Sequence, residues 1–371
     1  MPSPWSHAPI PYAATVENIE EDEAHSIAEL IDTMRSINQT TFRDSGHGYR
    51  SVHAKSHGLL AGELTVLPDL TEPLAQGLFA QAGNYPVVMR FSTTPGDLLD
   101  DSVSTPRGVA IKLIGVPGER LPGSENGMTQ DFVMVNGPAF NKPDLKSFLK
   151  AVKLLAKTTD KAQGLKKLFS ATLRGVEKTL EAVGSPSPTL LSMGGQPETH
   201  ILGDTFYTQA PLRYGRYMAK LALAPVSPEL TALTDQPLDV NGKPNGLRDA
   251  VVAFFAERSA TWELRVQLCT DLDTMPIEDA STPWPQSDSP YLPVARLVVQ
   301  PQPAWNESRV RAMDDGLSFS PWHGIAAHRP LGSIMRARQS VYRVMAEQRA
   351  AQNGGVIGEP RALDEIIRTK G

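Results

Sequence analysis

The sequence has little cysteine, no basic excess and no long apolar run, and each shortage excludes a class of protein. Its 371 residues include one cysteine, Cys269, so no internal disulfide can form and a reducing compartment is the simplest home. The formal net charge of −5 argues against binding to nucleic acid or to an anionic membrane surface. No stretch is long and uncharged enough to cross a bilayer, and the first residues lack the pattern of a signal peptide. We therefore expect a cytoplasmic protein without a membrane span.

Several signatures of common enzyme classes are also absent. The chain contains no phosphate-binding glycine loop, no GxSxG nucleophile turn, no CxxCH haem-attachment motif and no paired CxxC zinc signature. Nucleotide-binding proteins, serine hydrolases and zinc proteins are therefore less favoured classes.

The elements that the sequence does predict run in the order helix, strands, helices, strands, helix. Acidic residues followed by apolar residues at helical spacing predict one amphipathic helix within residues 17–42. Short β-rich runs bounded by Gly, Pro or Asp fill residues 53–138, and similar runs return after residue 198. Residues 143–184 predict a helical insertion, and residues 333–352 predict a final helix.

The two sets of strands are not separated by a low-complexity or clearly polar linker. A single barrel completed by both halves is therefore preferred to two domains, and the 40% of hydrophobic residues can supply its core. We predict an α+β fold, an antiparallel β-barrel with flanking α-helices. Residues 1–48 are expected to form an arm and helix, and residues 49–371 a single core domain.

The stretch RQSVYRVMAEQR places a tyrosine, Tyr342, on the predicted final helix with Arg338 and Arg349 on the same face. At about 100° per residue, the three side chains fall within a stripe of roughly 40°. A tyrosinate at neutral pH needs nearby positive charge, because phenol has a pKa of about 10, and Arg338 one turn away could supply that charge. Such a tyrosinate would be a ligand for ferric iron. The alternative is an exposed helix whose arginines pair with acidic side chains.

The stretch YRSVHAKSHG contains two histidines just before the first strand run. His53 is a candidate acid–base group, with a hydrogen-bonded structural histidine as the alternative. A metal site shared with His57 is disfavoured, because four residues of extended chain separate the two side chains by roughly 13 Å.

Two further stretches carry polar side chains that could serve a site. In MRFST, Arg90 and Ser92 alternate onto one face of a strand and would present a cation and a hydroxyl together. In DFVMVNGPAF, Asn136 ends a strand at a Gly-Pro turn, where asparagine is usually a turn former.

In chain order these stretches resemble the motifs of the haem-catalase superfamily. RSVHAK resembles the segment with the distal histidine, RFST the strand with the serine behind it, and TPRGVAIKL the strand that follows. VNGPAF resembles the asparagine segment and RQSVY the Arg-x-x-x-Tyr of the haem ligand. The resemblance spans residues 53–349 and is weak between the motifs. PWHGIAAHRPLGSIMRAR looks closer to the small catalase-related peroxidases than to full-size catalases.

The resemblance implies a catalase-like barrel that binds non-covalent haem b. Tyr342 would be the proximal iron ligand, kept ionised by Arg338, and Asn136 would donate a hydrogen bond to bound peroxide. His53 would be the distal acid–base group, oriented by Ser92. The other residues implied to bind haem are Val52, next to the distal histidine, and Arg50, Arg90 and Arg349 at the propionates.

The chain also departs from the family pattern. Ser56 and His57 interrupt the glycine-rich continuation of the histidine segment, and Gly137 stands in place of threonine. Only 22 residues follow Arg349, so we expect no carboxy-terminal helical domain and no NADPH binding.

The function implied is a haem b-dependent peroxidase with weak catalase activity. It would reduce hydrogen peroxide or organic hydroperoxides through a ferryl intermediate, with a small organic molecule as electron donor. The alternatives are a true catalase, rearrangement of fatty-acid hydroperoxides as in allene oxide synthases, a haem-binding protein without turnover, and a barrel without haem. A homo-oligomer, dimer or tetramer, is expected by analogy.

Overall fold

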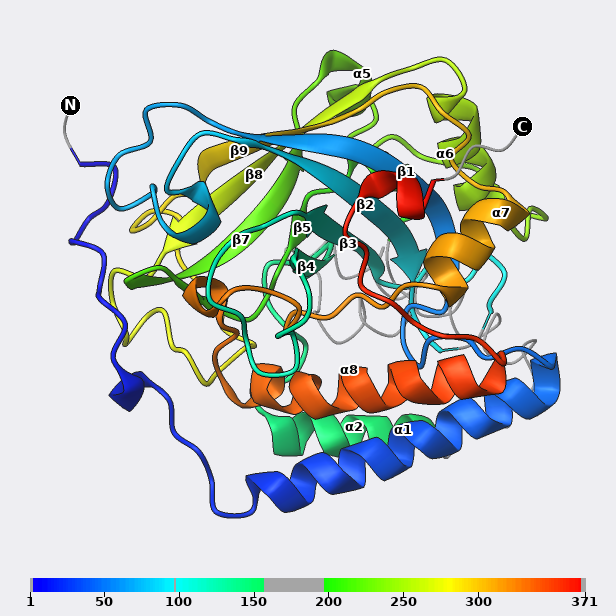
Figure 1. Cartoon of the computed structure of the whole chain (residues 1–371), viewed down its shortest axis with the longest axis horizontal. Coiled ribbons are helices and arrows are strands. Elements are labelled where there is room, and N and C mark those ends of the chain that lie inside the picture. Colours follow the sequence, from blue (N-terminus) through cyan, green and yellow to red (C-terminus); the bar gives the residue numbers. More distant parts are fainter. Residues whose placement is uncertain (1–2, 97, 157–196, 368–371) are drawn as a thin grey trace, which may run out of the picture.

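Strands from both halves of the sequence form one closed antiparallel barrel (Figure 1). The computed structural model describes residues 3–96, 98–156 and 197–367. Neighbouring strands follow the order β5-β4-β3-β2-β1-β9-β8-β7, and β5 also pairs with β7, which closes the ring. The barrel strands are β1 (Lys55–Val66), β2 (Asn84–Thr93), β3 (Arg107–Ile114), β4 (Thr129–Val135), β5 (Phe206–Tyr207), β7 (Tyr217–Pro225), β8 (Ala260–Leu268) and β9 (Leu292–Val299). A short strand, β6 (Leu212–Tyr214), pairs with β7 alone.

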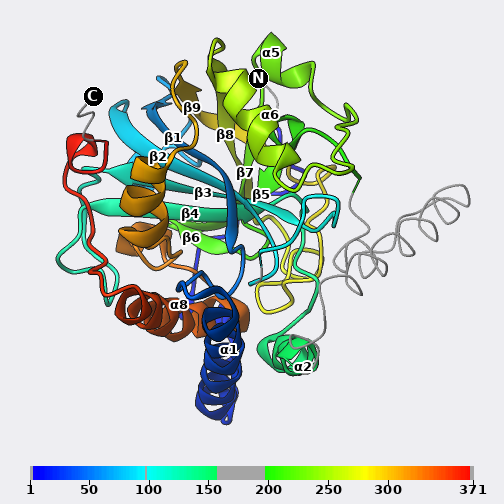
Figure 2. The same cartoon turned by 90° about the vertical axis from the view of Figure 1, so that its right-hand side faces the viewer.

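Three helices form a layer on one side of the barrel, below strands β2 to β4 in Figure 2. They are α1 (Glu23–Ser45), α2 (Leu145–Ala156) and α8 (Ser333–Gln352), and their apolar faces form a common core. The other helices within the described residues are α5 (Pro228–Thr231), α6 (Gly246–Phe255) and α7 (Glu307–Arg309), the last continuing into a π-helical turn at Val310–Asp315. Short 3-10 helices lie at Ala14–Val16, Gly77–Phe79, Ile201–Gly203, Ala326–His328 and Leu363–Glu365.

Side-chain alternation on β2 shows why both faces of this strand are apolar. Val87, Met89 and Phe91 point into the barrel and join its main core, which also contains the fully buried Trp262. Val88 belongs instead to a second cluster on the outer face. The outer face of β2 to β4 is therefore covered by other parts of the chain.

Strand β1 contains a β-bulge at the point where the sequence departs from the family pattern. Ser56 pairs with Ser92 and Gly58 with Phe91, so His57 is the extra residue between two regular pairs. The bulge lets the Ser56 side chain face outward, where its hydroxyl bonds Asp314.

The structure confirms the predicted barrel completed by both halves of the chain. The final helix spans Ser333–Gln352, as its pattern predicts. The predicted insertion at residues 143–184 is described only as far as Ala156, and its remainder lies outside the described residues. Helix α6 was not predicted, although its buried face repeats at helical spacing. The boundary at residue 48 stays a prediction.

Within the described ranges, no helix combines the length and the apolar character needed to span a bilayer. The chain after α8 is anchored to the barrel by a buried ion cluster. The fully buried ammonium of Lys112 lies 2.9 Å from the Asp131 carboxylate and 2.7 Å from Glu359, and Asp131 also accepts the Ser320 N–H. Asp131 is a fully buried partner of a fully buried cation.

Replacing Asp131 by Ala should therefore destabilise the fold strongly. We expect the free energy of unfolding to fall by about 3 kcal/mol, because Lys112 would keep its buried charge and lose one of its two carboxylates. Urea unfolding of the purified variant measures this loss. The exposed pair of Arg343 with Glu347 is the control, and Glu347→Ala should leave the unfolding midpoint unchanged. Equal effects of the two substitutions would contradict the expectation.

Candidate functional site

A cavity lies between the outer face of β2 to β4 and helix α8, and we refer to it as the main cavity. About 780 Å³ there is free of protein atoms, part of it open to solvent. Apolar side chains of four elements contribute to its walls: Met34 of α1, Val109 of β3, Met134 of β4, and Val341 and Met345 of α8. Phe319, which precedes α8 in the chain, also lines it.

Most of the residues singled out from the sequence meet at this cavity. Those that line it are Arg50, Val52, His53, Arg90, Ser92, Tyr342 and Arg349. Asn136 and Arg338 are not among the lining residues. The segments that come together are more than 200 residues apart in sequence, so their meeting is a property of the fold.

His53 lies against the sheet in an uncommon backbone conformation. Its φ of 55° is in the left-handed region, which few non-glycine residues adopt, although histidine does so more often than most. The imidazole Nδ1 is 3.3 Å from the Ser92 hydroxyl, and Arg90 donates to the His53 carbonyl at 2.9 Å. The turn also explains why Arg50 and His53 line one cavity, since a regular strand would have placed them on opposite faces.

Gly108 on β3 leaves the space that the His53 ring occupies. A Cβ atom on Gly108 would lie 2.7 Å from Cε1 and 2.8 Å from Nδ1 of His53. Such distances are below ordinary contact, so any larger residue would displace the ring. Glycine at this position therefore fixes how closely the imidazole approaches the sheet.

The surroundings of His53 favour its neutral form. Burial lowers its pKa to about 3, the guanidinium groups of Arg90 and Arg338 act in the same direction, and a hydrogen bond with Ser92 opposes them. At neutral pH the imidazole is therefore uncharged and can accept a proton. No described residue makes a hydrogen bond with its Nε2.

Tyr342 enters the main cavity from the opposite wall, on α8. Its neighbours one residue before and three residues after, Val341 and Met345, are buried in the three-helix core. That packing fixes the rotation of the helix and so directs the Tyr342 position toward the cavity. Among the described residues, none is a hydrogen-bond partner of the Tyr342 hydroxyl. The phenol is thus available to a ligand.

Three arginines that line the main cavity, Arg50, Arg90 and Arg349, gather around Asp314, and we call them the arginine cluster. All three contact Asp314, within the π-helical turn. Arg50 donates to its carboxylate at 3.0 Å and Arg90 at 2.5 Å, while Arg349 donates to its backbone carbonyl. Arg349 also donates to the Leu317 carbonyl at 2.8 Å.

The charges in the cluster affect one another strongly. Burial lowers the pKa of Arg349 to about 10, with Arg90 adding to the effect, and burial also lowers the pKa of Arg50 well below its usual range. Burial tends to raise the pKa of Asp314, but Arg90, Arg50 and the Ser56 hydroxyl outweigh it, so the net direction is downward. Asp314 is therefore a carboxylate among cations that repel one another.

The two predicted residues outside the cavity lining have other partners. The Asn136 amide donates to Asp204 at 3.2 Å and accepts the Arg107 N–H at 3.0 Å. Arg338 lies over the Phe140 ring, 5.4 Å from its centroid. No described contact joins Arg338 to Tyr342, although its charge reaches His53. The structure thus does not bring Asn136 and Arg338 together with the other seven.

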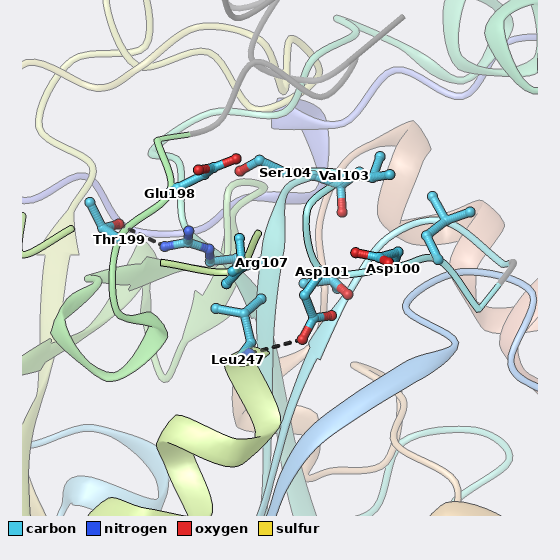
Figure 3. Close-up of a pocket in the computed structure, with 12 residues that line it drawn as sticks. Asp100, Asp101, Val103, Ser104, Arg107, Glu198, Thr199 and Leu247 are labelled. Carbon is cyan, nitrogen blue, oxygen red and sulfur yellow. Dashed lines mark hydrogen bonds between the residues drawn. The ribbon is translucent and has the colours of Figure 1, made fainter. Parts of the chain in front are cut away.

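A second, smaller cavity is lined by Thr93 at the end of β2 and Arg107 at the start of β3 (Figure 3). None of the predicted site residues lines it. Figure 3 shows Arg107 donating to Thr199, at 2.8 Å, and the Leu247 N–H donating to Asp101, also at 2.8 Å. The Asp101 carboxylate additionally binds the buried ammonium of Lys55 at 2.6 Å. These polar groups belong to a structural network.

His57 belongs to the same network and not to the main cavity. It is fully buried, with Nε2 2.9 Å from the Thr93 hydroxyl and Nδ1 3.8 Å from the Asp101 carboxylate. His53 and His57 therefore do not share a site, in agreement with their spacing in an extended segment.

Three residues at the site were not identified from the sequence. Gly108 is the glycine of the TPRGVAIKL stretch, and its contact with His53 forms only in the folded chain, so no sequence pattern around it could have predicted that contact. The Phe319 ring lies between two cations, 5.8 Å from Arg50 and 5.7 Å from Lys112. Asp314 is one of two adjacent aspartates in a polar segment, and only the fold directs its side chain to the arginine cluster.

Comparisons with known proteins agree with this fold. Rat catalase (Rattus norvegicus) is 28% identical over 272 residues, which are 69% of this chain and 48% of that protein. Mouse catalase (Mus musculus) is 27% identical over 271 residues, 68% and 48% of the two chains. No model of a known protein family matches the chain.

Solved catalase structures share the arrangement of strands and helices. A fungal catalase has a TM-score of 0.58 at 17% identity, covering 90% of this chain and 68% of that one. Catalase A of Saccharomyces cerevisiae has a TM-score of 0.56 at 17% identity, covering 95% and 68%. Identities this low support the fold only.

The chain therefore has a catalase-like fold, and its sequence is similar to those of two mammalian catalases. The chain spans about half the length of the curated relatives that it matches.

The contact between Gly108 and His53 gives a prediction for the site. We expect Gly108→Ala to displace the imidazole and to slow the peroxide reaction proposed below roughly a hundredfold, as misplacement by about 1 Å can do. Binding of the proposed haem should stay near the wild-type value, because the substitution leaves Tyr342 untouched. Stopped-flow absorbance of the haem-loaded protein measures the rate.

Gly137→Ala is the matched control for this substitution. A Cβ atom on Gly137 would lie 3.6 Å from its nearest neighbour, an ordinary contact, at the end of the adjacent strand. If Gly137→Ala slows the reaction as much as Gly108→Ala, the contact with His53 is not the cause.

Proposed function

We propose that the chain is a haem b-dependent enzyme that acts on peroxides, with peroxidase activity exceeding catalase activity. The observation that carries the proposal is the main cavity itself. His53 lies on its sheet side, Tyr342 comes from α8 on the other side, and three arginines form one end. Sequence similarity to catalases supports the same chemistry.

The residues of the main cavity fit haem b in three respects. Apolar side chains of β3, β4 and α8 suit the faces of a porphyrin, and the arginine cluster suits its two carboxylates. The hydroxyl of Tyr342, without a partner among the described residues, suits the iron. Tyr342 would therefore be the ligand, while Val52, Arg50, Arg90 and Arg349 would contact the rest of the group.

Bound haem would supply the electrons that cleave the O–O bond of a peroxide. The contribution of the chain is to move one proton. Neutral His53 would accept the proton of one peroxide oxygen at Nε2 and return it to the other oxygen. Water or an alcohol then leaves in place of hydroxide or alkoxide. The low pKa of His53 makes its protonated form a strong acid, which favours the second transfer.

Asn136 and Arg338 have roles in the proposal that need side-chain movement. The Asn136 amide would bind peroxide only after leaving Asp204, to which it donates at 3.2 Å. Arg338 lies one helical turn before Tyr342 and would favour the phenolate through its charge, without a direct hydrogen bond.

The rim of the main cavity favours access for an organic donor. Val52 lines the cavity and is 41% exposed, so the wall next to His53 reaches the protein surface. A donor larger than peroxide could approach there. The size of the opening beside Val52 therefore sets how fast an organic donor is oxidised relative to the release of oxygen.

Substitutions at the two opposing side chains test the proposal. Wild-type protein mixed with haem should show a Soret band typical of tyrosinate-ligated iron. We expect Tyr342→Phe to weaken haem binding by more than roughly tenfold, because the ligand is removed. His53→Gln should retain haem and react with peroxide about a thousandfold more slowly, because the proton acceptor is lost. Absorbance titration and stopped-flow measurements give the two quantities.

Tyr85→Phe and His25→Gln are the matched controls, since both residues lie outside the main cavity. Both control variants should bind haem and react with peroxide as the wild type does. Absence of a Soret band from wild-type protein after haem addition would rule out the proposed function.

The balance of activities is tested at the cavity rim. At equal hydrogen peroxide concentration, wild-type protein should oxidise a phenolic donor faster than it releases oxygen. Val52→Trp should slow oxidation of a bulky phenol more than the reaction with peroxide, because the larger side chain narrows the entrance. Donor absorbance and an oxygen electrode measure the two rates. Faster oxygen release by the wild type would favour a true catalase.

A further inference from the structure

Asp314 occupies the centre of the arginine cluster, and its role is not explained by the motifs. Its carboxylate accepts hydrogen bonds from Arg50, Arg90 and Ser56, and its side chain is only 14% exposed. It lies one residue before the end of a π-helical turn, a rare element that often occurs at functional sites. A buried carboxylate placed where ligand carboxylates are expected competes with them for the same cations.

The charges that meet at this point do not balance. Three guanidinium groups meet one carboxylate here, so the cluster keeps a net charge of two positive units; Arg349 bonds Asp314 only at its backbone carbonyl. The neighbouring carboxylate, Asp315, binds His47 at 3.0 Å and not the arginine cluster. A ligand with two carboxylates would supply the two missing negative charges.

Some guanidinium donors remain for such a ligand. Arg50 and Arg349 use their Nη atoms for Asp314 and nearby carbonyls, and within the described residues neither Nε–H has a hydrogen-bond acceptor. Both arginines line the main cavity. The cluster can therefore bind further acceptors while Asp314 stays in place.

The residue that orients Asp314 is one of the departures from the family pattern. The Ser56 hydroxyl donates to Asp314 at 2.5 Å and accepts from the Trp305 indole at 3.2 Å. Ser56 faces outward because His57 forms the bulge in β1. The bulge and the serine together give Asp314 a fixed position on the outer face of the barrel.

We propose that Asp314 is the internal counter-anion of the arginine cluster and limits the affinity of the main cavity for a dicarboxylate ligand. This inference rests on the proposed function, in which that ligand is haem b. In the ligand-free chain Asp314 reduces repulsion among Arg50, Arg90 and Arg349. In the loaded chain the same charge repels the ligand carboxylates and shares their donors.

Two opposite effects follow for Asp314→Asn. The apoprotein should be less stable, because Arg50 and Arg90 lose their directly bonded carboxylate and the whole cluster loses its negative charge. Haem should bind about tenfold more tightly, because a negative charge near its propionates is removed. The dimethyl ester of haem carries no carboxylates, so its affinity should not change. A purely structural role of Asp314 would instead weaken the binding of both compounds.

The experiment measures melting temperatures of apoproteins and dissociation constants from Soret titrations with haem and with its dimethyl ester. Asp315→Asn is the matched control, with the same charge change one residue away. It should alter haem affinity much less than Asp314→Asn. Unchanged or weaker haem binding by Asp314→Asn would overturn the inference.

A second variant covers the case in which Asp314→Asn does not fold. Combining it with Arg50→Gln removes one cation and one anion, so the net charge of the cluster is that of the wild type. The double variant should recover most of the melting temperature lost by Asp314→Asn. If the wild type binds no haem, the proposed function fails. The role of Asp314 as counter-anion is then tested by the melting temperatures of the apoproteins alone. A double variant less stable than Asp314→Asn would then overturn it.

Discussion

The position of helix α8 relative to the barrel is the constraint on which the candidate site depends. Near its first turn, Arg336 binds three carboxylates, those of Glu17, Glu23 and Glu278, at 2.7 to 3.0 Å. Near its last turn, Arg349 donates to backbone carbonyls before and after the end of the π-helical turn. Because both ends are fixed, the face of α8 that carries Tyr342 is held toward the outer surface of β2 to β4.

This arrangement explains why the cavity lies outside the barrel. The interior is filled by large side chains such as Trp262 and Phe91, so it has no room for a ligand. On the outer face, Gly108 and Ala110 provide a shallow surface opposite α8. Small residues on the strand and a fixed helix opposite it therefore create the space.

Much of the fold could be predicted from the sequence because it depends on local periodicity. The Tyr342 helix and the β-rich runs repeat at the spacing of their elements, and the order of motifs indicates the family. The conformation of His53 could not be predicted, since a left-handed φ at a histidine has no sequence signal. For the same reason the joint position of Arg50 and His53 at one cavity depended on resemblance alone.

Motifs also do not specify the rotamer of a side chain. Asn136 and Arg338 occupy the positions expected from the motifs, yet one binds Asp204 and the other lies over Phe140. Their partners come from distant parts of the chain, so no local pattern could have identified them. Asp314, in contrast, lies outside every motif and still contacts the arginine cluster, because the fold brings it there.

Features that cost stability are concentrated at the main cavity. They include the left-handed backbone of His53, the mutual repulsion within the arginine cluster and a phenol without a protein partner. A core selected for stability alone would replace buried cations by apolar side chains, which is often neutral or favourable. Such features tend to gather at functional sites. The haem proposed for this cavity would bring two carboxylates to the arginine cluster and a metal to the phenol, whereas an apolar ligand would do neither.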